Sequence, residues 1–262
     1  HLSIRRQRQM CIRDSSTNGI RINDSANSVN LIKIFDDGSF QTVTAGTSNL
    51  RLGLNAGNSI ASGGNFNTVV GDEAGTAIST GDNNTFLGYQ SGDAVNTGGD
   101  NVAIGFSALS AEDAHGLNVA VGSQALRVQN AGANAYNVGI GYNAGGAITT
   151  GIENTLIGGL AGDALTDADR NIAIGYQALT TDDLGSRTIA LGTGAVFSQN
   201  YATATNSHNI GIGDLSLFYN VTGVNNTFVG SAAGLGASGN SHSNNTGIGY
   251  AAGTAITTGS QN

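Results

Sequence analysis

The sequence predicts an all-β fold, a parallel β-solenoid with coils of about 17 residues, on three observations. Twelve copies of one phrase, Asn, then Thr, Val or Ile, then a variable residue, then Ile, Val or Leu, then Gly, recur with small departures between Asn49 and Gly249. The closing glycines are 17 residues apart in seven of eleven intervals and 18 to 21 apart in the others. Glycine is abundant (41) and proline is absent, so glycine at fixed offsets marks turns.

Residues 1–15 differ from the rest of the chain. They hold four arginines and the only Met and Cys, Met10 and Cys11, and share nothing with the repeats. We interpret them as a non-native leader and exclude them from the fold prediction. The chain begins without Met and stops in mid-repeat at TTGSQN, which indicates a fragment.

The charge of the remaining chain argues against two classes of partner. Without the leader, six basic and seventeen acidic residues remain, a formal charge of −11. An acidic surface disfavours binding to nucleic acid or to anionic lipid. Since no stretch is long and apolar enough to span a bilayer, we also expect no membrane insertion.

Residues 16–48 predict a small N-terminal β-hairpin element. The runs LIKIF and SFQTVT are rich in β-branched and aromatic residues, and DDG at Asp36–Gly38 separates them. Two such runs joined by a short Asp-Gly turn are typical of a hairpin.

The repeat domain, residues 49–262, has a strand in each phrase. All three strand positions are apolar, small or Thr in eleven of the twelve copies, so the pattern predicts burial on both faces. A lone solenoid buries only the inward face, and we expect the middle residue to face another copy of the chain. The predicted subunit-interface residues are Val69, Phe86, Ala103, Ala120, Leu156, Ala173, Ala190 and Phe228.

The first residue of the phrase predicts a ladder. A stacked Asn can hydrogen-bond turn backbone in its own coil and in the next. The predicted ladder residues are Asn67, Asn84, Asn101, Asn118, Asn137, Asn154, Asn171, Asn209, Asn226 and Asn245.

The residues after each closing Gly predict the coil core. Ala or Ser stands three positions later in every coil. One core slot is then filled in two ways, with positions counted from the closing Gly. Some coils have Gly at position four and an aliphatic residue at position seven, as in Gly75 and Ile78. Others have an aliphatic residue at position four and a polar residue at position seven, as in Leu109 and Glu112. We interpret this exchange as volume compensation in a stacked core.

No catalytic, cofactor-binding or metal-ligating residue is predicted. The acidic pairs Glu112–Asp113 and Asp182–Asp183 invite comparison with a glycosidase, but they recur at one offset in equivalent coils, which is typical of solvated turns. The four histidines, His1, His115, His208 and His242, share no metal-ligand spacing, and we expect exposure for the last two, which lie in Asn- and Ser-rich loops.

A family resemblance becomes specific at NVAIGFSAL, NVAVGSQAL and NIAIGYQAL. These segments closely resemble the head repeats of trimeric autotransporter adhesins (YadA-like heads), which also occur in bacteriophage tail fibres. The resemblance covers Asn49 to Asn262 and implies a left-handed parallel β-roll, three of which pack side by side as a homotrimer. It also implies an extracellular place, on a bacterial cell surface or a virion fibre. Typical head coils are shorter than those of this chain.

We therefore expect a structural and adhesive fibre segment without enzymatic activity or cofactor, whose partners are itself and a surface receptor or glycan. Two insertions, RVQNAGANAYN at residues 127–137 and FSQNYATATNSHN at residues 197–209, supply the candidate contact residues Tyr136, Tyr201 and His208. The alternatives are a tailspike-type β-helix that degrades polysaccharide, which requires an acidic cluster in a groove, and an ice-binding solenoid. A flat Thr row would favour the latter, but Val and Ile interrupt it.

Overall fold

The computed structural model describes residues 12–14, 20–23, 30–34, 40–42 and 45–262, with side chains from residue 45 onward. The N-terminal strands form an antiparallel four-stranded sheet in chain order: β1 (Ile12–Asp14), β2 (Ile20–Asn23), β3 (Asn30–Ile34) and β4 (Phe40–Thr42). The two predicted hairpin runs supply β3 and β4, which pair with Ile32 opposite Thr42. The predicted turn Asp36–Gly38 lies outside the described residues. Strand β1 falls within the predicted leader.

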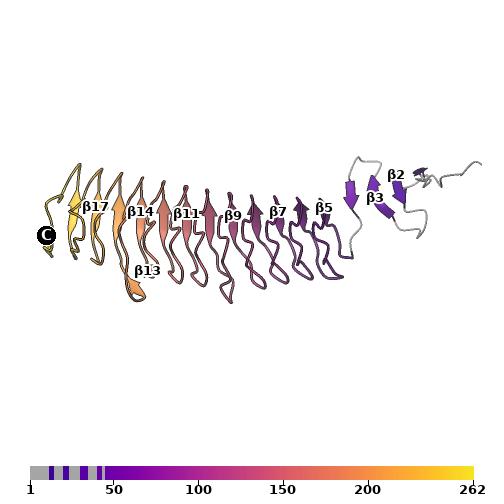
Figure 1. The fold of residues 1–262 in the computed structure, drawn as a ribbon, viewed down its shortest axis with the longest axis horizontal. Coiled ribbons are helices and arrows are strands. Elements are labelled where there is room, and N and C mark those ends of the chain that lie inside the picture. The colour runs from indigo at the N-terminus through magenta and orange to yellow at the C-terminus, as the bar shows by residue number, and fades with distance from the viewer. Residues whose placement is uncertain (1–11, 15–19, 24–29, 35–39, 43–44) are drawn as a thin grey trace, which may run out of the picture.

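The repeat domain is a parallel β-solenoid of twelve coils, as predicted. Each phrase forms one three-residue strand, and every strand pairs in parallel and in register with the strand of the next coil, as Val138 does with Thr155. Figure 1 shows the coils stacked side by side into a rod. The strands are β5 (Leu50–Leu52), β6 (Thr68–Val70), β7 (Thr85–Leu87), β8 (Val102–Ile104), β9 (Val119–Val121), β10 (Val138–Ile140), β11 (Thr155–Ile157), β12 (Ile172–Ile174), β14 (Ile189–Leu191), β16 (Ile210–Ile212), β17 (Thr227–Val229) and β18 (Thr246–Ile248).

The two inserted loops leave this register intact. Val119 still pairs with Val138 across the first insertion, and Ile189 pairs with Ile210 across the second. In the second loop, β15 (Thr205–Asn206) pairs in parallel with β13 (Gly185–Ser186), which lies in the turn before β14. The second loop projects from the rod beside the β13 label in Figure 1. Extra residues therefore extend a coil sideways without breaking the stack.

The middle residue of each strand points into the coil, so the predicted interface is wrong. All eight predicted interface residues are completely buried within a single chain. Side chains alternate along a strand, and the buried Asn two positions earlier sets the inward direction. The residues on either side of the middle one face outward and are partly exposed, as Ile172 (37%) and Ile174 (38%) show. The corrected residues are Val69, Phe86, Ala103, Ala120, Leu156, Ala173, Ala190 and Phe228.

The coil core shows the predicted exchange between positions four and seven. In one kind of coil, Gly75 has φ of 53°, and a Cβ atom there would lie 2.7 Å from Cδ1 of Ile78. Glycine therefore makes room for the buried isoleucine. In the other kind, Leu109 is buried at position four, and the polar residue Glu112 at position seven is buried beside it. The slot is filled in both cases, at the close packing of a protein interior.

The predicted asparagine ladder is confirmed. Oδ1 of Asn154 accepts the backbone N–H of Asn171 in the next coil at 2.9 Å. Its Nδ2 donates to the carbonyl oxygen of Ala168 at 2.8 Å, in the turn that closes its own coil. The same pair of bonds recurs with small variations along the rod, and the ladder side chains are almost completely buried. Each asparagine therefore satisfies one buried N–H and one buried C=O.

At Thr188, which stands where the other coils have asparagine, another residue supplies the ladder's hydrogen-bond acceptor. The backbone N–H of Thr188 still donates to Asn171 Oδ1 at 2.8 Å, but threonine has no carbonyl oxygen for the following coil. The hydroxyl of Ser207, 2.6 Å from the Thr188 hydroxyl, accepts the backbone N–H of Asn209 instead at 3.2 Å. Ser207 comes from the second insertion, so that loop replaces the acceptor that its coil lacks.

Replacing one ladder residue should destabilise the rod strongly. Asn154→Ala leaves the N–H of Asn171 and the C=O of Ala168 buried without their partner. We expect a loss of about 2 to 4 kcal/mol in the free energy of unfolding, measured by urea denaturation. Asn200→Ala, at an exposed position, is the matched control and should change it by less than about 0.5 kcal/mol. Equal losses in the two variants would contradict the role of the ladder.

Candidate functional site

The recurring acidic pairs do not form solvated turns, because their first members are buried. Glu112 and Asp182 are completely buried, whereas Asp113 is exposed and Asp183 partly so. Glu112 Oε1 accepts the backbone N–H of His115 at 3.1 Å, and its Oε2 accepts from Gln129 Nε2 at 3.2 Å. Position seven faces the coil interior, as the aliphatic residues of the other coils occupy it. The prediction of solvated turns was therefore wrong for Glu112 and Asp182.

Both buried carboxylates are joined to the ladder through a glutamine of the next coil. Gln129 Oε1 accepts from Asn137 Nδ2 at 3.1 Å. In the equivalent pair, Gln199 Nε2 donates to Asp182, and Gln199 Oε1 accepts from Asn209 Nδ2 at 2.8 Å. Hydrogen bonds in these polar clusters thus connect the side chain at position seven with the asparagine ladder.

Burial dominates the electrostatics of the second cluster. It raises the pKa of the Asp182 carboxyl above its ordinary value, and the hydrogen bonds from Gln199 and the Gly185 N–H offset only part of the shift. Because Asp182 and its equivalent Glu112 are buried and hydrogen-bonded, neither is positioned to meet a polysaccharide substrate. A glycosidase requires a pair of carboxyl groups that flank the scissile bond.

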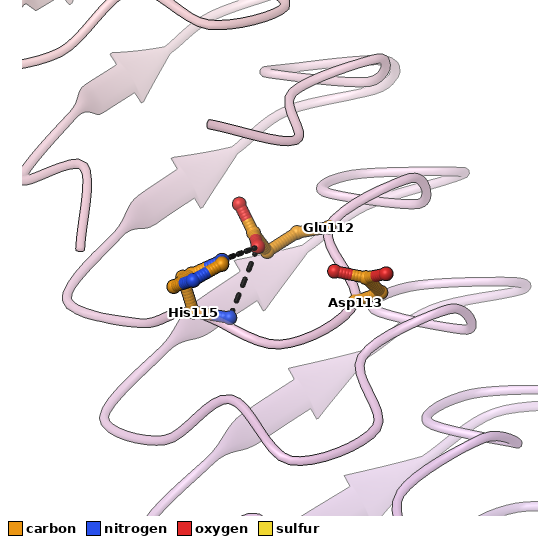
Figure 2. Close-up of side chains that lie close together, drawn as sticks. All are labelled: Glu112, Asp113 and His115. Carbon is orange, nitrogen blue, oxygen red and sulfur yellow. Dashed lines mark hydrogen bonds and ion pairs between the residues drawn. The ribbon is translucent and has the colours of Figure 1, made fainter. Parts of the chain in front are cut away.

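One cluster with metal-binding side chains occurs among residues 45–262. Glu112, Asp113 and His115 each bring one ligand atom within 4.8 Å of the others, and Figure 2 shows them in a single turn. The spacing among the histidines did not predict this cluster, because the residues grouped with His115 are carboxylates of the same turn and not other histidines. Glu112 Oε1 already accepts the His115 N–H and lies 3.4 Å from His115 Nδ1, so Glu112 and His115 close a hydrogen-bonded turn in which Asp113 takes no part.

The three predicted contact residues separate into two groups. Tyr136 (55% exposed) and His208 lie on the surface. Tyr201 is 5% exposed, and its hydroxyl donates to the Gly223 carbonyl oxygen at 2.8 Å. Burial, followed by the charge of Asp182, raises the pKa of this phenol. The prediction that Tyr201 contacts a ligand was therefore wrong, because the residue is buried and its hydroxyl also accepts a hydrogen bond from the ladder residue Asn209, at 3.2 Å from Nδ2.

His242 is buried, contrary to the expected exposure. Its Nδ1 lies 3.2 Å from Asn226 Oδ1, and its ring meets Phe228 edge-on, with centroids 5.5 Å apart. In this coil the Phe228 ring lies against Gly234 at position four, and Ala237 at position seven is exposed and adds no side chain to the core. Its Nε2 is buried without a hydrogen-bond partner in the structure, and burial lowers the pKa of the imidazole.

The surface feature that sequence reasoning missed is the outward face of the long sheet. In every coil the first and third strand residues are Thr, Val, Ile or Leu, and in several coils an exposed aromatic residue follows the closing Gly. Alternation counted from the buried Asn would have indicated this face. The exposed aromatic residues are Tyr89, Phe106, Tyr142, Tyr176 and Tyr250.

The fold defines the chain as a repeat protein of the parallel β-solenoid class. A search of family models, of curated proteins and of solved structures found no match to this chain. Within the described ranges, no helix is both long and apolar enough to cross a membrane.

Acid should destabilise the rod through His242. The imidazole has an ordinary pKa of 6.5 and a lower one when folded, so below pH 6.5 the unfolded chain takes up a proton that the folded chain resists. We expect the contribution of His242 to the free energy of unfolding to fall as the pH drops from about 7.5 to about 5.5, whereas the raised pKa of Asp182 acts in the opposite direction. His242→Asn should remove the His242 contribution, so that its stability relative to wild type rises as the pH falls, and His208→Asn, at an exposed site, should leave the dependence unchanged. An unchanged slope in His242→Asn would contradict the assignment.

Proposed function

We propose that this chain is a segment of a homotrimeric, extracellular adhesive fibre, in which three left-handed β-rolls pack against each other through their outward sheet faces. The apolar character of that face is the observation that carries the proposal. None of the twenty-four outward strand positions in the twelve coils is charged, although the chain as a whole is acidic.

The outward face is large, continuous and partly exposed. Leu87 (46%), Ile140 (36%) and Ile174 (38%) lie on it in different coils. At its edge, Tyr89 and Phe106 stack with ring centroids 5.9 Å apart. Parallel sheets are normally covered on both faces, and apolar patches of more than a few hundred Å² mark interaction sites. This face therefore favours a permanent partner.

A second and a third copy of the chain fit this face better than an unrelated partner. The face repeats with the spacing of the coils, about 4.8 Å, over a length of roughly 50 Å. A partner that covers every coil needs the same period, and an identical chain has it. When identical chains are related by closed rotational symmetry, each chain covers the outward face of its neighbour. No outward face is then left uncovered.

The mechanism that follows is multivalent contact. Three identical rods in one fibre present every surface site three times, and weak individual sites combine into strong attachment. The partner class is a cell-surface glycan or protein receptor. The burial and hydrogen bonding of Glu112 and Asp182 favour this non-enzymatic role over the tailspike alternative.

The trimer is tested by solution mass. Light scattering should give three times the chain mass of 26.2 kDa. Ile174→Asp places a charge on the outward face. The variant should be a folded monomer, because the trimer contact would bury that charge without a partner. Thr181→Asp, at an exposed turn position, should remain a trimer. A soluble wild-type monomer with the β-rich circular dichroism of the rod would refute the proposed assembly.

A further inference from the structure

A second repeated surface feature precedes the strands. Two residues before every strand of the long sheet stands a residue other than glycine with φ between 48° and 66°. This left-handed conformation is uncommon outside glycine, and its recurrence in all twelve coils means that the turn imposes it. We call these positions the display row. They are Ser48, Phe66, Asn83, Asp100, Leu117, Tyr136, Glu153, Arg170, Arg187, His208, Asn225 and Asn244.

The display row is exposed and held in register. Eleven of its twelve residues are exposed, and Leu117 is partly so. The backbone N–H of Arg170 donates to the Ile152 carbonyl oxygen of the preceding coil at 3.0 Å, and that of Arg187 donates to the Asp169 carbonyl oxygen at 3.0 Å. Neighbouring members therefore follow each other at the coil spacing of about 4.8 Å, on a rigid support.

Charge is distributed unevenly along this row. Residues 45–262 contain four arginines and fourteen acidic residues, and two of the arginines, Arg170 and Arg187, are neighbours in the row. Arg170 Nε pairs with Glu153 Oε2 at 2.6 Å. Arg187 Nε donates only to the neutral Asn206 Oδ1 at 3.1 Å, and no carboxylate of the described chain forms an ion pair with Arg187. Glu153 offsets the charge of Arg170, whereas the charge of Arg187 is offset by no ion pair within the described chain, so Arg187 can attract an anion.

We propose that the display row from Tyr136 to His208 binds a short glycan that carries one carboxylate. The planar guanidinium of Arg187 matches a carboxylate in two parallel hydrogen bonds. Tyr136, 55% exposed, lies three coils away, about 14 Å, and offers an apolar ring on which a sugar can stack. The acidic rod repels polyanions, so a single carboxylate on otherwise neutral sugars suits it.

The inference deepens the proposed adhesive function, since it names the ligand class of the fibre. Two of the residues first predicted as contacts, Tyr136 and His208, belong to the row, which explains their exposure. The buried Tyr201 does not belong to it. An acidic peptide offers the same carboxylate chemistry, but it does not use the stacking surface of Tyr136 in the way that a sugar ring does.

The test is isothermal titration calorimetry of the full chain with sialyllactose, which carries one carboxylate, and with lactose, which carries none. We expect sialyllactose to bind at least about tenfold more tightly. Arg187→Gln should remove this preference, and Tyr136→Ala should weaken the binding of both sugars. Arg127→Gln is the matched control, because Arg127 is also exposed and outside the row, and it should change affinity by less than about twofold.

Equal or absent binding of the two sugars overturns the inference, and so does full affinity in Arg187→Gln. Binding of a glutamate-rich peptide in place of sialyllactose would assign the row to a protein ligand and overturn the glycan. Light scattering on the same samples separates this inference from the proposed assembly. A trimer that does not distinguish the sugars refutes only the glycan site, and a monomer that prefers sialyllactose refutes only the trimer.

Discussion

The buried asparagine ladder is the interaction on which the rest of the structure depends. A coil with three-residue strands has few backbone hydrogen bonds within itself, so its polar groups must be satisfied by the coils on either side. Asparagine has both a carbonyl oxygen and an amide nitrogen at the right reach, and each ladder residue therefore links two coils. The repair at Thr188 shows the strength of this requirement, because a hydroxyl from an inserted loop, that of Ser207, replaces the missing acceptor.

The ladder also sets the direction of every other side chain in the phrase. With the asparagine inside, the middle strand residue is inside and its neighbours are outside. The interior then has a fixed volume, which the chain fills with an aliphatic residue at position four or at position seven. Where position seven is polar, as at Glu112 and Asp182, it joins the ladder through a glutamine of the next coil. The same interior positions thus hold packed aliphatic side chains in some coils and hydrogen-bonded polar side chains in others.

The direction in which the strand side chains point has two consequences for function. The outward strand residues form an uncharged apolar face, which supports assembly with other copies of the chain. The turn before each strand is held in a left-handed conformation, which presents one exposed side chain per coil at a constant spacing. The first feature is constant along the rod, as an assembly surface needs to be. The second varies from Phe66 through Tyr136 to Arg187, as a recognition surface needs to.

The sequence by itself determined the period, the parallel stacking, the ladder and the exchange between core positions four and seven. These features repeat in twelve copies, and repetition removes the ambiguity of a single short phrase. Only the tertiary structure decided which way the strand faces. Uncharged strand residues such as Thr85, Phe86 and Leu87 do not distinguish the two faces, and the sequence alone does not show that the asparagine before them points inward. The same reason explains Tyr201 and His242, whose burial depends on how their own coils close around them. Local polarity carries no information about a cavity that distant residues of the coil create.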